Sequence, residues 1–495
     1  MWLYSLLELD LKSLVLFLFA YLLITDFLKQ RKPSGFPPGP RGLPFVGSVF
    51  SLDPKLPHIY LTRLAEVFGN VYSIRLGREK MVCVVGYETV KEALVTQADC
   101  FVSRPPSSLA ERIYSGNGLF LSSGILWKKQ RRFALSTLRN FGMGKTSLES
   151  FIIEESRFLQ EEIECEKGNP FNPHILLNKA VSNIICILVF GRRFDYADHE
   201  FETLLKLLAE ILYLEGTIWA LLYESFPKVM KVLPGPHNRI FGNYDRLSDF
   251  LVEDLKRRNA ERDPSGPRDY IDSFLAEMEK NAEDPALGFH QKNLILCALD
   301  LFLAGTETTS TTLRWALLFM IKYPHIQSKV QDEIDRVIGP SRPPSMTDRA
   351  SMPYTNAVVH EVQRKGNILP LGVPHMADRD TSLGGYFIPK GTPLIVNLHS
   401  VLFDEKEWHM PDIFDPERFL DSNGNFAKKD AFLPFSAGKR VCLGEQLARA
   451  ELFLFLTCFL QKFSFSPPPG VEPSLEPEGG GTMAPIPFKI CAHPR

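Results

Sequence analysis

The chain has 495 residues, of which 45% are hydrophobic and 23% are charged, a balance typical of a packed globular protein and not of a disordered one. The net charge of −2 excludes a whole-protein electrostatic attraction to nucleic acid, so we expect no nucleic-acid partner. The eight cysteines include no Cys-x-x-Cys pair, which argues against a structural zinc site or a thioredoxin-like centre.

The N-terminal region contains an apolar run over residues 13–28 that is interrupted at Asp26. A helix of this length spans about 24 Å, less than the roughly 30 Å of the hydrocarbon core. A cleaved signal peptide is the alternative, but no basic stretch precedes the run and no small-residue cleavage site follows it. Lys29, Arg31 and Lys32 come directly after the run. We therefore expect residues 1–32 to form a transmembrane anchor, with the following residues in the cytosol.

The rest of the chain predicts a mainly α protein with a small β region. Residues 33–48 contain Pro37, Pro38 and Pro40, which favour an extended strut, and residues 49–495 are expected to form one catalytic domain. Hydrophobic periodicity predicts helices over 151–166, 178–190, 201–214, 244–259, 292–322 and 445–463, and β-prone runs over 71–85 and 383–398. Residues 479–481 are all glycine, and they precede an apolar run that predicts a late hairpin. No Gly-rich dinucleotide fingerprint follows a strand, so we expect no nicotinamide or flavin site.

One cysteine lies in a segment that suits a metal thiolate. Residues 435–444 read FSAGKRVCLG, and a helix pattern starts at Glu445. Gly438 permits a tight turn that brings backbone N–H groups toward the sulfur, and the following helix N-terminus stabilises the thiolate of Cys442. Phe435 is placed to cover one edge of that sulfur. The alternative is an ordinary buried cysteine at a turn.

The pattern Phe-x-x-Gly-x-Arg-x-Cys-x-Gly resembles the signature of the cytochrome P-450 superfamily at every fixed position. The resemblance covers essentially the whole chain and is closest to the vertebrate microsomal family 2. The stretches AGTETTSTTLRWAL and SMPYTNAVVHEVQR look most like its fatty-acid epoxygenase branch. The resemblance implies the cytochrome P-450 fold, haem b as the cofactor and Cys442 as the axial ligand of the iron.

A polar patch interrupts the long apolar helix expected over 292–322. Gly305 and the neighbouring threonines are poor helix formers, and their hydroxyls can bond to backbone carbonyls, so we expect a locally opened helix. The alternative is a tolerated polar helix contact. The patch is similar to the oxygen-activation motif of the family, which implies that Glu307 and Thr308 pass protons to bound dioxygen.

Two further groups of residues match the family. Glu361 and Arg364 lie on one helix face, and the resemblance joins them to Arg418 in a structural network; taken alone they predict a solvated pair. Lys365 stands where many relatives carry an apolar residue. The resemblance assigns a further set of residues to the haem propionates: Trp127, Arg131, Arg440, Arg104 and His375. For Trp127 and Arg131 the alternative is a buried tryptophan beside a surface arginine.

The favoured function is a haem-thiolate monooxygenase that oxidises lipophilic substrates such as xenobiotics, steroids or polyunsaturated fatty acids, including arachidonate. We expect the substrate pocket between Ala304 and residues 369–373, with Leu369 and Val373 lining it and Ile113 and Met483 closing it. Two alternatives stay open: a haem-thiolate peroxide isomerase, and a haem-binding sensor without catalysis. Glu307 and Thr308 argue against the isomerase, which needs no delivered protons.

The resemblance also implies an electron donor and a location. The expected donor is NADPH–cytochrome P-450 reductase, with cytochrome b5 as a further candidate, because the chain carries no flavin site. Lys128, Lys129, Arg132 and Lys439 form a basic cluster where an acidic flavin domain would dock; a solvated basic face is the alternative. The expected location is the endoplasmic reticulum membrane, with the catalytic domain on the cytosolic face.

Overall fold

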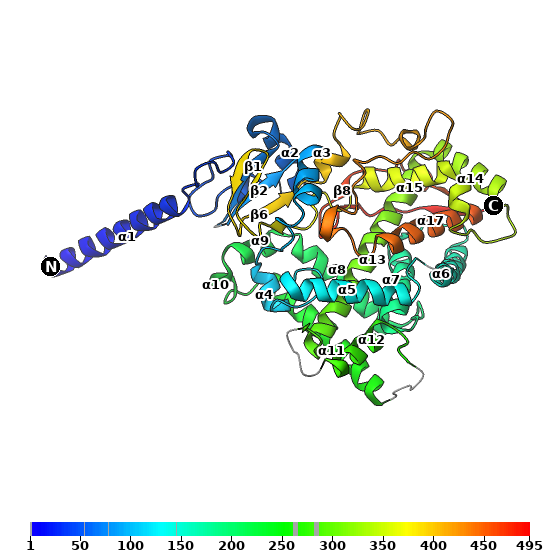
Figure 1. Cartoon of the computed structure of the whole chain (residues 1–495), viewed down its shortest axis with the longest axis horizontal. Helices are drawn as coiled ribbons and strands as arrows, with labels where there is room; N and C mark the ends of the chain where they lie inside the picture. The colour runs from blue at the N-terminus through cyan, green and yellow to red at the C-terminus, as the bar shows by residue number, and fades with distance from the viewer. Residues whose placement is uncertain (1, 54, 78, 145, 261–265, 282–286) are drawn as a thin grey trace.

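Helices make up most of the molecule, and a small sheet lies at the side of the body from which the N-terminal helix projects (Figure 1). The structure is a computed structural model that describes residues 2–53, 55–77, 79–144, 146–260, 266–281 and 287–495. Met1, where the expected anchor begins, lies outside these residues. The prediction of a mainly α protein with a small β region is confirmed.

The helices follow one another along the chain. They are α1 (Trp2–Lys29), α2 (Pro57–Phe68), α3 (Tyr87–Lys91), α4 (Ser108–Tyr114), α5 (Gly124–Asn140), α6 (Thr146–Cys165), α7 (His174–Phe190), α8 (His199–Glu215), α9 (Ile218–Ser225), α10 (Pro227–Met230), α11 (His237–Ala260), α12 (Tyr270–Lys280), α13 (Gln291–Lys322), α14 (Pro324–Val337), α15 (Pro353–Gly366), α16 (His399–Leu402) and α17 (Glu445–Lys462). Single turns of tighter or wider helix are η1 (Val49–Ser51), η2 (Glu92–Thr96), η4 (Asp348–Ser351), η5 (Pro416–Phe419) and η6 (Gly438–Arg440). The six helices expected from periodicity are all present, although α11 begins earlier than expected.

The strands form one four-stranded sheet and three two-stranded ones. They are β1 (Val71–Leu76), β2 (Glu79–Val84), β3 (His375–Met376), β4 (Thr381–Leu383), β5 (Tyr386–Ile388), β6 (Pro393–Val396), β7 (Phe463–Ser466), β8 (Pro477–Glu478), β9 (Ala484–Pro485) and β10 (Cys491–Pro494). The larger sheet has the order β1-β2-β6-β3, in which β2 pairs in parallel with β6 and the other pairs are antiparallel. The expected late hairpin is the antiparallel pair β8–β9.

Helix α13 runs through the middle of the helical part and is buried along most of its length (Figure 1). The His290 side chain caps its N-terminus by accepting from the Asn293 N–H. The expected local opening at the threonine patch is absent, because the helix is continuous from Gln291 to Lys322. A Cβ added at Gly305 would lie 2.9 Å from Ile185 of α7, so this glycine permits close packing of α13 on α7.

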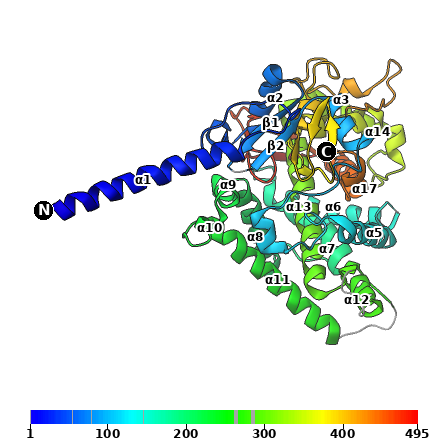
Figure 2. The same ribbon diagram turned by 60° about the vertical axis from the view of Figure 1, so that its left-hand side comes forward.

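Helix α1 projects away from the body of the protein in both ribbon views (Figures 1 and 2). Among the described residues, no helix is both long enough and apolar enough for a membrane crossing. The transmembrane helix expected from the sequence is therefore corrected: the helix exists, but Lys12 and Asp26 confine its apolar run to fewer residues than a crossing needs. Asp26 belongs to the body, because its carboxylate accepts from the Arg75 guanidinium of β1 at 2.6 and 3.0 Å.

The proline-rich segment packs on the sheet rather than standing off from it. The Ser73 N–H donates to the Pro38 carbonyl over 2.6 Å, and Lys32 Nζ donates to Ser73 Oγ over 2.7 Å. A Cβ at Gly39 would lie 1.8 Å from the Ser73 carbonyl oxygen, so only glycine allows this approach. The segment therefore fixes the base of α1 to β1.

Candidate functional site

The loop between η6 and α17 holds Cys442 in one backbone conformation. The Cys442 N–H donates to the Phe435 carbonyl over 3.0 Å, which closes the loop. Gly438 has φ +72°, and a Cβ there would lie 1.8 Å from the Leu94 carbonyl oxygen of η2. Glycine is thus the only residue that fits, because both the backbone conformation and the space exclude a side chain. The loop is pinned to η2 by this contact.

The Cys442 thiol faces an enclosed space. Only Cys442 and Cys165 are exposed among the eight cysteines. Desolvation by the surrounding protein nevertheless raises the pKa of the Cys442 thiol, whereas backbone N–H groups of Gly444 and Glu445 and the charge of Arg131 lower it. A thiol that is accessible and yet desolvated lines an internal space, with N–H donors of a helix N-terminus directed at its sulfur.

Neither the backbone conformation nor the neighbouring protein atoms require glycine at position 444. Its φ of −89° suits any residue. A Cβ added there would have no protein atom within 4 Å. This open space two residues after Cys442 leaves room for a flat cofactor, and the chemistry of a thiolate ligand suits a haem there.

Arg440 and Arg131 both lie near the ring of Trp127, beside Cys442. The Arg440 guanidinium carbon lies 3.7 Å from the centre of the Trp127 ring. Arg440 also donates to the Val102 and Ser122 carbonyls over 2.8 and 2.6 Å. Arg131 donates to the Val441 carbonyl, next to Cys442. Two elements that are distant in sequence, α5 and η6, therefore place two guanidinium groups and an indole at the edge of the site.

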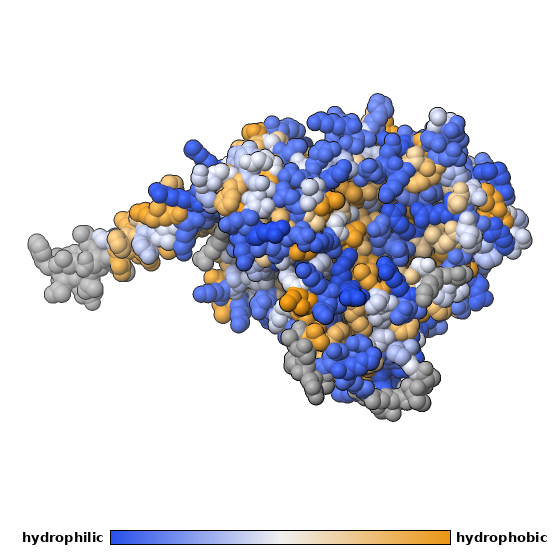
Figure 3. Space-filling model, in the orientation of Figure 1, coloured by the Kyte–Doolittle hydropathy of each residue, from blue (hydrophilic) through white to orange (hydrophobic). Residues whose placement is uncertain are grey.

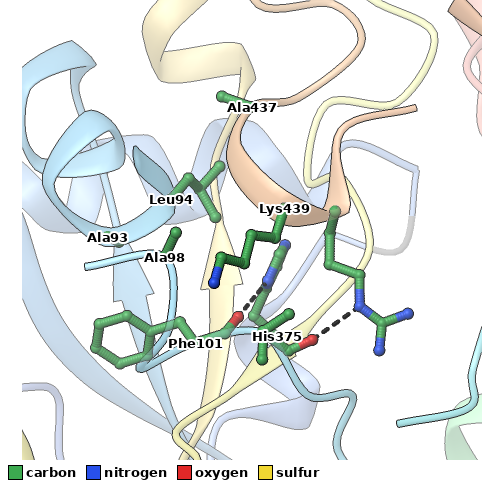
Figure 4. A pocket seen from close by; sticks show the side chains of 9 residues that line it. Ala93, Leu94, Ala98, Phe101, His375, Ala437 and Lys439 are labelled. Carbon is green, nitrogen blue, oxygen red and sulfur yellow. Dashed lines mark hydrogen bonds between the residues drawn. The ribbon is translucent and has the colours of Figure 1, made fainter. Parts of the chain in front are cut away.

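Arg104 and His375 complete this cluster, which we call the arginine region (Trp127, Arg131, Arg440, Arg104 and His375). Arg104 donates to the Val373 and Pro374 carbonyls over 3.0 and 2.9 Å. His375 Nδ1 donates to the Phe101 carbonyl over 2.7 Å, and Figure 4 shows this bond beside Lys439 and Ala437 of the cysteine loop. A narrow crevice between η2 and the cysteine loop is lined by Leu94, Phe101, His375 and Lys439, among others.

The arginine region carries positive charge without a carboxylate partner. None of the ion pairs in the described part of the chain involves Arg104, Arg131 or Arg440. Burial, together with repulsion from Arg131, lowers the pKa of Arg104 to about 10. Burial and repulsion from Arg104 and Arg131 lower the pKa of Arg440 to about 8. Buried cations in such mutual repulsion require an anion, and the two propionates of haem b fit this need.

Helix α13 contributes Ala304, Glu307 and Thr308. Ala304 is exposed although most of α13 is buried, which indicates an internal space beside it. The Thr308 hydroxyl donates to the Ala304 carbonyl over 2.7 Å. Glu307 points elsewhere: its Oε1 accepts from the Thr311 hydroxyl over 3.0 Å and from the Thr482 hydroxyl over 3.4 Å. Burial raises the pKa of Glu307. The structure thus places the two residues on adjacent positions without a direct hydrogen bond between them.

The residues expected to line the substrate pocket come from three separate segments. Leu369 and Val373 are half-buried in the loop that follows α15, and the Met483 N–H donates to the Ile368 carbonyl over 2.9 Å. The Met483 carbonyl accepts from Trp315 Nε1 of α13 over 2.9 Å. Ile113 on α4 packs against the aromatic cluster of Tyr223 and Phe241. Met483 and the Leu369 segment therefore meet directly, whereas Ile113 approaches from the α9 and α11 side.

Glu361, Arg364 and Arg418 meet in a cluster in which Glu361 and Arg364 are completely buried and Arg418 is half-buried. Arg364 donates to both Glu361 carboxylate oxygens over 2.7 and 2.8 Å, and Arg418 Nε donates to Glu361 Oε1 over 3.1 Å. The remaining Arg364 donors reach the Leu402 and Pro411 carbonyls. Lys365 lies near Asp412 and over the Phe403 ring, at the edge of this cluster. The contacts tie α15 to the long loop that leads to the cysteine.

Several partners of the site escaped the sequence reasoning. Thr482 and Thr311 bond Glu307, and Asp378 accepts from the Val102 and Ser103 N–H groups over 3.3 Å. Arg314 is 5% exposed within α13 and donates to the Pro485 carbonyl over 3.0 Å. An arginine inside the apolar run TTLRWALL is a signal that could have indicated this contact. The backbone carbonyl partners carry no such signal, because any residue provides them.

The basic cluster on α5 lines a groove of about 550 Å³ at the surface. Its walls include the following residues: Trp127, Lys128, Arg131, Arg132, Leu135, Ser136, Arg139 and Lys439. Lys129, expected in the same cluster, is not among them. Trp127 and Arg131 belong both to this groove and to the arginine region, so the groove reaches from the surface to the edge of the candidate haem site.

The geometry agrees with comparisons to known proteins. The sequence profile of the family described as Cytochrome P450 matches residues 37–492. Human Cytochrome P450 2J2 is 50% identical over 98% of this chain and 96% of its own length. Rat Cytochrome P450 2J3 is 50% identical over 98% of this chain and 97% of its length, and gorilla Cytochrome P450 2F5 is 44% identical over 94% and 95%. The chain therefore belongs to the cytochrome P450 family of haem b-binding, haem-thiolate monooxygenases.

Proposed function

We propose that this monooxygenase hydroxylates or epoxidises lipophilic compounds, in particular polyunsaturated fatty acids such as arachidonate, and also xenobiotics and steroids, with electrons from NADPH delivered by a reductase. The main observation in support of this reaction is the Cys442 sulfur, which is accessible but desolvated. It lies near backbone N–H donors and the arginine region. The substrate class is supported by the apolar residues Leu369, Val373 and Met483 near α13.

A haem whose iron is bound by a cysteine thiolate activates O2 so that one oxygen atom enters a C–H bond or an alkene. In this chain, Cys442 is the proposed iron ligand, and the Gly444 and Glu445 N–H groups tune its sulfur. Arg104, Arg131 and Arg440 would hold the propionates, together with Trp127 and His375 of the same region. Phe435 covers the loop, and its ring packs 5.1 Å from the Arg449 guanidinium.

Glu307 and Thr308 are the proposed proton-handling groups. Burial raises the pKa of Glu307, so its carboxyl group holds a proton at higher pH than an exposed glutamate does. The Thr308 hydroxyl rests on the Ala304 carbonyl and can turn toward the internal space. Thr308→Ala should still bind haem and substrate but divert NADPH electrons to peroxide. Unchanged coupling of NADPH to product would remove Thr308 from the mechanism.

The substrate is identified by an untargeted experiment. The enzyme, reconstituted with reductase and NADPH, is incubated with a lipid extract, and oxygenated products are profiled by mass spectrometry. Monooxygenated fatty acids that require both O2 and NADPH support the proposal. The Cys442→Ser variant is the control; it should lose the products and the red-shifted Soret band of the reduced carbon monoxide complex. Products that survive in this variant would contradict the assignment of the ligand.

Two other functions are distinguished by the same reconstitution. A haem-thiolate peroxide isomerase would convert a lipid peroxide without NADPH, and a haem sensor would bind haem without consuming NADPH in the presence of reductase. The enclosed carboxyl of Glu307, bonded by two hydroxyls, favours a reaction that consumes protons. The monooxygenase proposal fails if the reconstituted enzyme consumes no NADPH with any lipid.

The surface groove on α5 is the proposed docking site for NADPH–cytochrome P-450 reductase, and cytochrome b5 is a second candidate donor for the same surface. Lys128, Arg132, Arg139 and Lys439 line it, and Trp127 connects it to the arginine region. Lys439 also pairs with Asp99, so part of its charge is neutralised. A flavin domain with an acidic surface would be attracted to the remaining cations.

Charge reversal tests this docking site. Lys128→Glu combined with Arg132→Glu and Lys439→Glu should slow reductase-driven turnover several-fold, and raised salt should weaken the wild-type partnership. Turnover driven by added peroxide should survive, because it bypasses the partner. Equal loss in both assays would mean that the haem site is damaged and would contradict docking at the groove.

Membrane attachment is proposed from exposed apolar side chains. Those of α1 are exposed around the helix from Leu14 to Leu28, and Figure 3 shows the apolar surface of this projection. Ile218, Trp219, Val229 and Val232, of α9 and the α10 region, are also exposed. Helices α1 and α10 lie at the same end of the molecule in both ribbon views (Figures 1 and 2). Such patches indicate a lipid contact.

We place this contact at the endoplasmic reticulum membrane, with the catalytic domain on the cytosolic face. The proposed division is an anchor over 1–32, a proline-rich segment over 33–48 and a haem-binding domain over 49–495. Deletion of residues 1–32 should weaken binding to lipid vesicles and leave haem incorporation intact. Failure of the truncated protein to take up haem would contradict this division. The deletion also removes Asp26, which pairs with Arg75 of β1, so the experiment tests whether the haem-binding domain folds without that ion pair.

A further inference from the structure

The turn between β8 and β9 begins with three glycines, which have no side chains. Gly479, Gly480 and Gly481 are each half-buried at the surface. The turn packs closely against the end of α8, since a Cβ at Gly216 would lie 2.5 Å from the Gly480 carbonyl carbon. The Gly481 N–H donates to the Leu212 carbonyl over 2.9 Å. Water therefore reaches the backbone of this turn directly, because the three glycines have no side chains to cover it.

Thr482, the next residue, is 8% exposed and held from both sides. The flanking Met483 donates to the Ile368 carbonyl and accepts from Trp315 Nε1, both over 2.9 Å. Arg314 donates to the Pro485 carbonyl over 3.0 Å. Two consecutive residues of α13 thus fix the hairpin, and Thr482 stands between the glycine turn and α13.

Two hydroxyls contact the same oxygen of Glu307. Thr311 Oγ1 lies 3.0 Å and Thr482 Oγ1 lies 3.4 Å from Glu307 Oε1. Thr311 is completely buried, on the same helix as Glu307. Thr482 instead adjoins the half-exposed glycine turn. A hydroxyl both donates and accepts a proton, so only Thr482 has a route to solvent as well as to the carboxyl group.

We propose that Thr482 is a proton-relay residue that connects solvent at the Gly479–Gly481 turn to Glu307. The Thr482 Oγ1–H proton moves to Glu307 Oε1, and a water molecule at the turn returns a proton to Thr482 Oγ1. The sum is the transfer of one proton from solvent to the carboxylate, with no change in electron count. The proposal rests on the proposed role of Glu307 and names the path that refills it. Thr311 and Arg314 position Glu307 and the hairpin by their hydrogen bonds and carry no proton on this path.

The direct test is hydrogen–deuterium exchange of the Glu307 carboxyl group in the haem-loaded enzyme. The C=O stretch of the protonated group is identified by infrared spectroscopy as the band that Glu307→Gln removes, at a pH where wild type shows it. After mixing with D2O, the downshift of this band should be at least about tenfold slower in Thr482→Val, since the hydroxyl is lost and the shape is kept. Thr482→Ser should exchange at the wild-type rate. Exchange in Thr482→Val as fast as in wild type would overturn the proposal.

Thr311→Val is the matched control, because it removes the other hydroxyl on the same oxygen. It should move the band, through loss of a hydrogen bond, without slowing exchange. If Thr311→Val slows exchange and Thr482→Val does not, the path runs inside α13 and the proposal is wrong. Thr482→Ala provides a second deletion of the hydroxyl, and each variant is compared with wild type by its carbon monoxide spectrum before exchange is measured.

Coupling measurements separate this inference from the proposed function. Thr482→Val should lower the ratio of product to NADPH consumed and change the solvent isotope effect, whereas peroxide-driven turnover should be retained. If Glu307→Gln leaves coupling unchanged, Glu307 itself is not the donor and the proposed function fails in this respect. If Glu307→Gln uncouples and Thr482→Val exchanges normally, only the Thr482 path fails.

Discussion

Two groups of buried or half-buried arginines differ in how their charge is met. In the first, Arg364 and Arg418 both donate to the carboxylate of Glu361. In the second, the arginine region, Arg104, Arg131 and Arg440 donate to backbone carbonyls and form no ion pair with a carboxylate of the described residues. Both groups make hydrogen bonds, but only the first contains a carboxylate that balances its charge.

The charge of the first group is balanced within the protein, whereas the charge of the second group is balanced only when an anion binds. A buried cation without an anion costs several kcal/mol of desolvation, and carbonyl dipoles offset only part of that cost. The Glu361 cluster therefore stabilises the folded chain by itself. The arginine region destabilises the chain until an anion binds, so its residues should behave differently under mutation.

The largest effect is expected in the first group. Glu361→Gln leaves Arg364, whose side chain is 0% exposed, without its carboxylate, and should cost about 3–5 kcal/mol of unfolding free energy. Urea unfolding followed by fluorescence measures the change. Glu417→Gln, which removes an exposed ion pair with Lys329, is the control and should change the unfolding free energy by less than about 1 kcal/mol. A midpoint for Glu361→Gln equal to that of the control would contradict the view that this cluster is structural.

The second effect should appear only with haem. Arg104→Gln removes one cation and keeps a donor for the Val373 and Pro374 carbonyls, so the haem-free protein should lose no stability. Loss of one charge-assisted hydrogen bond should weaken haem binding about 10- to 100-fold, equivalent to about 1.4–2.8 kcal/mol. Haem transfer to an acceptor protein measures the affinity, and thermal unfolding of the haem-free form measures the stability. A haem-free variant destabilised as strongly as Glu361→Gln would erase the distinction between the two groups.

The third effect is a difference in acid sensitivity between two histidines. Burial and the charges of Arg104 and Arg440 lower the pKa of His375 to about 3, and burial with the charges of His58, Lys365 and Arg364 lowers the pKa of His399 to about 3. Each folded-state pKa lies below the unfolded value of about 6.5. Each histidine therefore contributes stability that is fully present above pH 6.5 and is lost as pH falls toward 3, at about 1.4 kcal/mol per pH unit.

Bound haem should separate these two contributions. Propionates near His375 would raise its pKa, so that His375→Asn changes the pH slope of stability in the haem-free protein but hardly in the haem-loaded one. His399→Asn should change the slope equally in both forms, because the charged groups near it, His58, Lys365 and Arg364, lie outside the arginine region. Unfolding free energies between pH 6.5 and 4 measure the slopes. An equal effect of haem on both variants would contradict the placement of the propionates beside His375.

The sequence predicted the framework well because helix periodicity and loop signatures are local. The six long helices, the β8–β9 hairpin and the loop around Cys442 each follow from residues within one segment. Three expectations needed correction. Helix α13 is not opened at Gly305, since the glycine faces Ile185 of α7. Helix α1 lacks the composition of a membrane crossing, and the proline-rich segment lies on β1.

The contacts that could not be predicted are those made by backbone atoms or by partners distant in sequence. The carbonyl groups of Val102, Ser122 and Val373 hold the arginines, and no side chain at those positions announces the role. Thr482 and Glu307 are far apart in the chain and have no shared motif. Residue type indicates which side chains can donate or accept a proton. Which of these side chains meet, as Thr482 and Glu307 do, depends on how the hairpin packs on α13.

The contact at Gly438 also limits how this protein can change through mutation. A side chain at position 438 would collide with the backbone oxygen of Leu94, and every amino acid at position 94 carries that oxygen. No replacement of Leu94 can therefore compensate for a substitution of Gly438, unlike a collision between two side chains, which a smaller partner relieves. A genetic screen for second-site suppressors of Gly438→Ala should return changes that move η2 as a whole and none that only trims the Leu94 side chain.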